Sequence, residues 1–209
     1  MKMTNEDMQK ALKVCYEKAL DGLPISKSVP ELGTHYLNKY PSKETAAKHL
    51  INAQVAKCTT SGFITSLGGL ITLPVAVPAN ITSVLYVQLR MIATIAYIGG
   101  FNPSDDEVQT LAYLCLTGTA ISDVIKGTGI KIGQKVAVNT LKKIPGTVIT
   151  KINRSVGFRL LTRFGEKGAV NLVKLIPGVS GIIGGTIDLA STKIIAQKAY
   201  SIFIEGRVM

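Results

Sequence analysis

Residues 58–89 read CTTSGFITSLGGLITLPVAVPANITSVLYVQL, a run of 32 residues without a charged side chain. Pro74 and Pro78 divide this run into a longer arm and a shorter one. A helix that spans a membrane needs about 20 continuous apolar residues, and two prolines four positions apart interrupt a helix. The run therefore predicts an apolar helical hairpin with its corner at Pro74, Val75, Val77 and Pro78.

Helical signals continue on both sides of this run. Thr4 with Asp7, and later Ser104 with Glu107, have the spacing of a capping box at the start of a helix. The apolar residues that follow recur at helical spacing, and we find no alternation typical of a strand. Helices are predicted over about 5–21, 30–40, 43 into the apolar run, 80 or 82 to 98, 105–116, 149–160 and 179–203.

These elements predict an all-α fold, a single helical bundle of about seven or eight helices over residues 1–209. Its segments are N-terminal helices (1–41), the apolar hairpin (42–101), a basic helical segment (102–175) and a glycine-rich C-terminal helix (176–209). The amino terminus shows no signal peptide, because charged residues interrupt every apolar stretch there.

The positive charge is concentrated in one stretch. The chain carries a formal net charge of +11, and residues 126–174 contain eleven Lys or Arg residues against one acid, Glu166. Such a block is typical of proteins that bind anionic lipid or nucleic acid. Its candidate membrane-facing residues are Lys131, Lys135, Lys142, Lys143, Lys151, Arg154, Arg159 and Arg163.

Two main alternatives remain for the partner of this basic face. Amphipathic patterning over 130–161 and the neighbouring apolar hairpin favour anionic membrane lipid. A solvated or protein-binding face is the second alternative. Nucleic acid is disfavoured, because Phe158 and Phe164 are the aromatic residues of the block and no recognition motif is present.

The C-terminal helix carries small residues on one face, with Asp188 among them. A carboxylate in such a place needs a partner. Arg90, which shares a helix face with Tyr86, is the one charge between Lys57 and Asp105. Pairing of Arg90 with Asp188 would fix helix register; alternatively Tyr86, Arg90, Asp188 and Thr192 would bind a lipid headgroup.

The sequence offers little for catalysis. His35 and His49 are the two histidines, and Cys15, Cys58 and Cys115 are far apart, without metal-ligand spacing. The glycines do not match a phosphate-binding loop. We therefore expect no enzymatic activity, no catalytic residue, no metal and no cofactor.

Two blocks of the chain resemble the EcsC protein family. They are SGFITSLGGLITLPVAVPANITSVLYVQLRMIATIAYIGGF, residues 61–101, and IPGVSGIIGGTIDLASTKIIAQKAYSIF, residues 176–203. The positions similar to the family pattern are Gly62, Gly68, Gly69, Pro74, Pro78, Arg90, Gly181, Gly185, Asp188 and Thr192. The resemblance implies a bacterial protein associated with a membrane process, and it implies no catalytic residue.

These observations together predict a non-enzymatic accessory or scaffold protein at the membrane surface. It would attach peripherally or monotopically to the cytoplasmic side of the inner membrane, through anionic lipid and with a possible membrane-protein partner. Two alternatives remain open: a lipid- or acyl-chain-binding protein with a headgroup site near Arg90 and Asp188, and a membrane-perturbing, toxin-like protein.

Overall fold

The described part of the computed structural model comprises residues 3–24, 26–58, 77–118, 145–164 and 185–207. These residues form seven α-helices and contain no β-strand, which confirms the all-α prediction. The helices are α1 (Asn5–Asp21), α2 (Val29–Lys39), α3 (Lys43–Cys58), α5 (Ala79–Ile98), α6 (Asp106–Leu116), α9 (Gly146–Phe164) and α11 (Gly185–Phe203).

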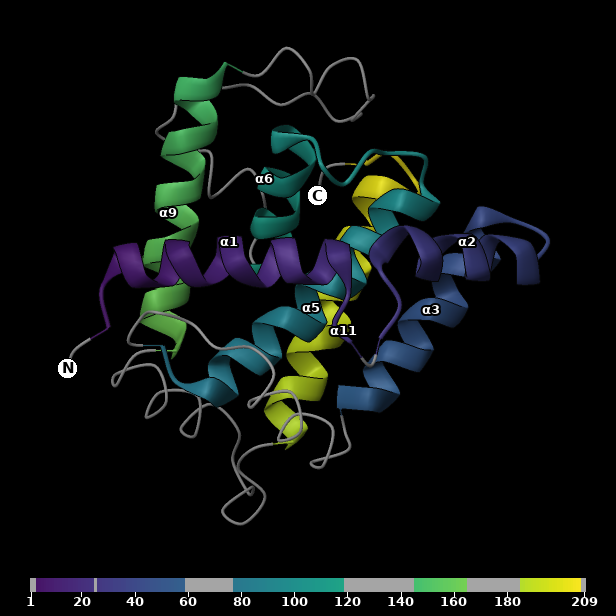
Figure 1. Ribbon diagram of the computed structural model, residues 1–209, viewed down its shortest axis with the longest axis horizontal. Helices are drawn as coiled ribbons and strands as arrows, with labels where there is room; N and C mark the ends of the chain where they lie inside the picture. The colour runs from purple at the N-terminus through teal and green to yellow at the C-terminus, as the bar shows by residue number, and fades with distance from the viewer. Residues whose placement is uncertain (1–2, 25, 59–76, 119–144, 165–184, 208–209) are drawn as a thin grey trace.

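Helix α5 forms the centre of the bundle and packs against α1, α2, α3, α6 and α11 (Figure 1). Within the described residues, its segment Ile81–Ile98 is the one helix long and apolar enough to cross a membrane, with a mean hydropathy of 1.5. Other helices bury 83% of that segment. Its composition is therefore accounted for by a place in the core of the bundle.

The helix starts follow the capping signals in one case and depart from them in another. Thr4 and Asp7 form the predicted capping box, with the Asp7 amide donating to Thr4 Oγ1 at 3.1 Å. The predicted Ser104–Glu107 box is wrong, because Asp105 is the N-cap of α6. In a turn that begins at Asn102, the Asn102 side chain donates to Asp105 Oδ1 at 2.7 Å and accepts from the Ser104 amide, and the helix starts one residue later than predicted.

The structure describes the second arm of the predicted hairpin. Helix α5 ends at Ile98 before Gly99, as the sequence predicted, but it begins at Ala79, directly after the exposed N-cap residue Pro78, and not at residue 80 or 82. Val77 is buried. The corner residues Pro74 and Val75 and the longer arm lie outside the described residues.

Two contacts fix the direction of α11 along α5. The Gln88 side chain donates to Thr192 Oγ1 at 3.0 Å. At the other end, a Cβ atom added to Gly99 would collide with the Phe203 carbonyl oxygen. The contacting residues advance equally along both helices, so α5 and α11 run parallel, and their backbones approach closely where both end.

Candidate functional site

Helix α9 lies at the outer edge of the bundle, where it packs against α1 and α6 (Figure 1). Of the apolar residues at helical spacing in this segment, Ile152, Val156 and Leu160 are buried, and Ile149 is half-buried. The helix contains Lys151, Arg154, Arg159 and Arg163 and no acidic residue. One face therefore holds α9 in the core, and the opposite face is free to carry charge.

The outward face of α9 presents two cations and an aromatic ring. Lys151 and Arg154 are exposed, and Phe158, one turn further on, is 62% exposed. The spacing of three and four residues places them in one stripe about 10 Å long. We call Lys151, Arg154 and Phe158 the α9 stripe.

The threonines beside this stripe are turned back onto the helix. Thr150 Oγ1 donates to the Gly146 carbonyl at 3.0 Å, and Thr162 Oγ1 donates to the Phe158 carbonyl at 2.9 Å. Hydroxyls satisfied by their own helix are less available to a ligand. The stripe therefore presents mainly positive charge and apolar surface.

The remaining residues of the predicted basic face are only partly described. Arg159 is half-buried on α9. The side chain of Arg163 and the whole of Lys131, Lys135, Lys142 and Lys143 lie outside the described residues. Their place on a membrane face stays a prediction.

Tyr86 and Arg90, two candidates for a headgroup site, lie together on one face of α5. They hold the connection between α1 and α2: Tyr86 Oη lies 3.3 Å from Ser26 Oγ, and Arg90 Nη2 donates to the Lys27 carbonyl at 2.7 Å. The two contacts are one helical turn apart. Both side chains therefore hold this connection against α5.

The guanidinium of Arg90 is enclosed, with the residue 5% exposed. Burial lowers its pKa, while the nearby hydroxyls of Tyr86 and Tyr36 act in the opposite direction. Among the described residues, no carboxylate lies within ion-pair distance and Arg90 Nε has no hydrogen-bond partner. A buried charge normally requires a counter-charge, so Arg90 remains the natural partner for an acid or anion.

Thr192, another predicted headgroup residue, faces a different side of α5. Its partner is Gln88, which lies two positions, or about 200°, around the helix from Arg90. The structure therefore brings Tyr86 and Arg90 together but places Thr192 elsewhere. The side chain of Asp188 lies outside the described residues, and its pairing with Arg90 stays a prediction.

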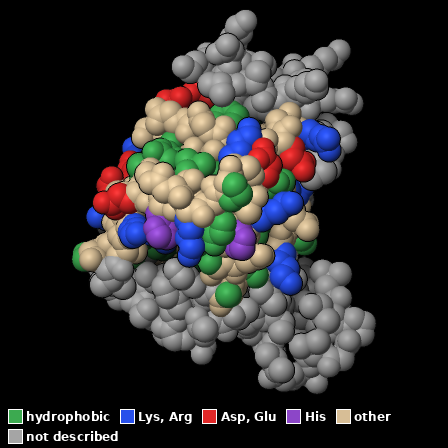
Figure 2. Space-filling model, turned by 90° about the vertical axis from the view of Figure 1, so that its right-hand side faces the viewer, with side chains coloured by type: hydrophobic (Ala, Val, Ile, Leu, Met, Phe, Trp, Pro, Cys, Tyr) green, Lys and Arg blue, Asp and Glu red, His purple; other side chains and the backbone are tan. Residues whose placement is uncertain are grey.

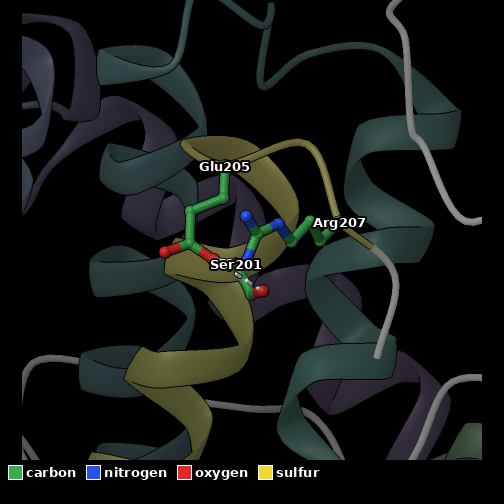
Figure 3. A network of polar contacts seen from close by, with 3 residues as sticks. All are labelled: Ser201, Glu205 and Arg207. Carbon is green, nitrogen blue, oxygen red and sulfur yellow. Dashed lines mark hydrogen bonds and ion pairs between the residues drawn. The ribbon is translucent and has the colours of Figure 1, made fainter.

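A pocket of about 490 Å³ opens between α3 and α11. On one wall, Lys48 Nζ lies 5.9 Å from the centre of the Tyr200 ring. On another, Glu205 Oε2 accepts from Ser201 Oγ at 3.1 Å and lies 4.0 Å from Arg207 Nη1 (Figure 3). Acid and base are both engaged by neighbouring side chains, so the pocket favours no single charge.

The face over α2 and α3 gathers histidine, hydrophobic and Lys or Arg side chains (Figure 2). The Tyr40 and His49 rings stack at 4.0 Å, and His35 packs edge-on against Tyr36. Both histidines are exposed. Their described ring contacts are with tyrosines.

The two described thiols, Cys15 and Cys115, are buried. Burial raises the pKa of Cys15 and of Cys115 to about 12. A thiol is nucleophilic as the thiolate, so neither is activated at neutral pH. No group of three potential metal ligands occurs among the described residues.

The fold and these sites define an all-α bundle with a cationic, aromatic outer helix. The chain belongs to the EcsC protein family, whose model matches residues 2–204. This confirms the resemblance seen in the sequence. No curated protein and no solved structure matches the chain.

Proposed function

We propose that this protein is a non-enzymatic accessory or scaffold protein that docks on anionic membrane through the α9 stripe. The proposal rests on the 62% exposure of Phe158 beside Lys151 and Arg154, on a helix without an acidic residue. A single exposed apolar side chain is ordinary on a protein surface. Here it is flanked by cations, the combination that binds a charged lipid interface.

The expected strength of this docking is the sum of the contributions of the three side chains in the stripe. Each Lys or Arg near an anionic leaflet contributes about 1 kcal/mol. Complete burial of a Phe side chain contributes about 1.5–3 kcal/mol. The stripe alone therefore supplies roughly 4 kcal/mol, equivalent to a dissociation constant near 1 mM. We infer a reversible attachment, strengthened by whichever other basic residues of 126–174 face the lipid.

The proposal includes a place and a partner class. We place the protein on the cytoplasmic side of the inner membrane, where the surface charge of the lipid complements the stripe. Helix α9 lies at one end of the bundle and helices α2 and α3 lie at the other (Figure 1), so the α2–α3 face is offered to a membrane-protein partner. The buried thiols and the tyrosine-packed histidines support a binding role over catalysis.

Vesicle co-sedimentation tests this function. The Lys151→Gln/Arg154→Gln variant is expected to bind vesicles containing 30 mol% anionic phospholipid about 30-fold more weakly, because two contributions of about 1 kcal/mol are lost. Phe158→Ser is expected to lose a further tenfold or more through reduced apolar burial. Binding by the unaltered protein should weaken with added salt.

The matched control is Lys18→Gln/Lys39→Gln, which removes the same charge. Both lysines are exposed, at the end of α1 and of α2 farthest from α9 (Figure 1). This control should bind almost as well as the unaltered protein. Equal loss in both double variants would mean that net charge alone drives binding, and unchanged binding in both would exclude the α9 stripe.

A further inference from the structure

A second pocket lies where α1, α6 and α9 meet, with a volume of about 260 Å³. This is slightly below the range of roughly 300–1,000 Å³ typical of sites for drug-sized ligands, so it suits a small molecule. The buried Leu12 contributes an apolar wall. The polar lining is formed by Gln9, Lys10, Lys13, Gln109, Tyr113 and Asn153.

Two buried polar atoms in this lining have no hydrogen-bond partner among the described residues. They are Tyr113 Oη and Asn153 Oδ1. Tyr113 is 5% exposed, and burial raises the pKa of its phenol, which stays neutral and able to donate. Nearly all buried polar groups in proteins are paired with protein atoms or water, so two in one pocket mark a place where a bound molecule can pair with them.

The chemistry of the lining limits what that ligand can be. Asn153 Oδ1 is an acceptor, so the ligand must carry a hydrogen-bond donor. Lys10 and Lys13 offer donors and positive charge, so the ligand must also carry an anionic oxygen. Two lysines disfavour an ammonium group as the donor, and a hydroxyl is a neutral donor that fits beside them.

Two described acids interact with these lysines, and neither cancels their charge. The pKa of Asp7 is lowered mainly by the hydrogen bonds of its carboxylate with Thr4, and Lys10 helps to lower it. Glu17 lies 3.9 Å from Lys13 Nζ, and both side chains are largely exposed. Exposed ion pairs of this kind are weak, so Lys13 can turn to a ligand at small cost. The negative charges of Glu17 and Asp106 also raise the pKa of the Tyr113 phenol.

The width of the pocket is set by the close approach of α1 to α9. A Cβ atom added to Gly157 would collide with Asn5 Oδ1 and lie 3.0 Å from Gln9 Cγ. Asn5 Nδ2 in turn donates to the Arg154 carbonyl at 3.3 Å. These contacts hold the lysines of α1 beside Asn153 of α9.

We propose that this pocket binds a phosphate ester that carries a free hydroxyl group, such as glycerol 1-phosphate or the phosphoglycerol headgroup of an anionic lipid. The phosphate accepts from Lys10, Lys13 and Tyr113 Oη. The ligand hydroxyl donates to Asn153 Oδ1. Binding thereby satisfies both unpaired atoms and neutralises the lysines.

The lipid form of this ligand rests on the proposed function, whereas the soluble form does not. Asn153 directly precedes Arg154 of the α9 stripe, so a headgroup at the docking surface lies close to the pocket. A soluble ester reaches the same residues without any membrane. Testing both sources therefore separates failure of the pocket from failure of membrane docking.

The closing experiment compares the same substitution in two touching rings, Tyr113→Phe and Tyr16→Phe. The rings pack edge-on at 5.7 Å, but Tyr16 Oη donates to the Pro103 carbonyl at 2.8 Å. Tyr113→Phe removes an unpaired hydroxyl, so the Tm of the free protein should stay the same or rise. Tyr16→Phe removes a satisfied bond and should lower it.

Binding is measured by isothermal titration calorimetry with glycerol 1-phosphate, inorganic phosphate and glycerol. We expect glycerol 1-phosphate to bind most tightly, with affinity at least tenfold lower in Tyr113→Phe and in Lys10→Gln/Lys13→Gln, and unchanged in Tyr16→Phe. Vesicles with phosphatidylglycerol should bind more tightly than vesicles with an equal charge of phosphatidylserine, a preference that Tyr113→Phe should abolish.

Three results would overturn the inference. The first is no binding of glycerol 1-phosphate, which leaves the α9 stripe untouched if anionic vesicles still bind. The second is equal affinity for inorganic phosphate, which would remove the hydroxyl from the proposal. The third is an equal effect of both tyrosine substitutions on affinity. If soluble ester binds and vesicles show no preference, the ligand is the soluble one.

Discussion

Gly99→Ala is expected to lower the free energy of unfolding by about 3 kcal/mol, near the upper end of the usual cost of overpacking. The backbone of Gly99 is in the right-handed helical region, so the alanine causes no conformational strain there. The cost comes from its methyl group, which would collide with the Phe203 carbonyl oxygen. Because the obstacle is backbone, α5 and α11 must separate as whole helices.

Urea unfolding followed by circular dichroism measures this loss. The control is Gly146→Ala at the start of α9, where an added Cβ meets nothing within 4 Å. That variant should be neutral or slightly stabilising, because alanine favours the helix more than glycine does. A loss below about 0.5 kcal/mol for Gly99→Ala would show that the ends of α5 and α11 do not approach as described.

Gln88→Leu is expected to lower the free energy of unfolding by about 2 kcal/mol. Gln88 and Thr192 are almost completely buried, and the Gln88 amide donates to Thr192 Oγ1 at 3.0 Å. Leucine has a similar size but cannot bond to the hydroxyl. An unpaired buried polar group costs about 1–3 kcal/mol.

The double variant Gln88→Leu/Thr192→Val should recover most of that loss. Removing both partners of a buried hydrogen bond leaves no unpaired group and is often nearly neutral. Urea unfolding of the two single variants and the double variant gives the coupling energy directly. Simple addition of the single losses would mean that the two side chains do not contact each other.

The helices themselves were largely predictable because their signals are local. The Thr4–Asp7 capping box and the spacing of Ile152, Val156 and Leu160 act within one or two turns, and both appear as expected. The start of α6 was mispredicted for a reason that is also local. The Asn102 side chain donates a hydrogen bond to Asp105. A capping pattern in the sequence does not show which of two neighbouring polar turns will form.

The candidate site was less predictable, because its partners come from distant parts of the chain. Arg90 was recognised as an unusual charge on an apolar helix, but its described partner is a backbone carbonyl, which no sequence pattern marks. Gln88 was missed as the residue facing Thr192. The available signal was a long polar side chain two positions from Arg90, on a helix of mostly apolar residues.

The α1–α6–α9 pocket could not have been found from sequence. Tyr113 lies in an apolar helix, and Asn153 lies in a basic one, so each has an ordinary explanation in its own element. Their shared lack of partners arises only when three helices pack together. Phe158, by contrast, was visible as an aromatic residue in the basic block, and the structure adds its exposure.

The parallel pairing of α5 with α11 also has a consequence during synthesis. The Gln88–Thr192 contact spans 104 residues. At roughly 5–20 residues per second, a ribosome needs about 5–20 s to make that length. Throughout this interval the most apolar described helix has emerged while one of its covering helices does not yet exist. A nascent chain in that state is the form most exposed to chaperones and to the bilayer, before the finished bundle conceals α5.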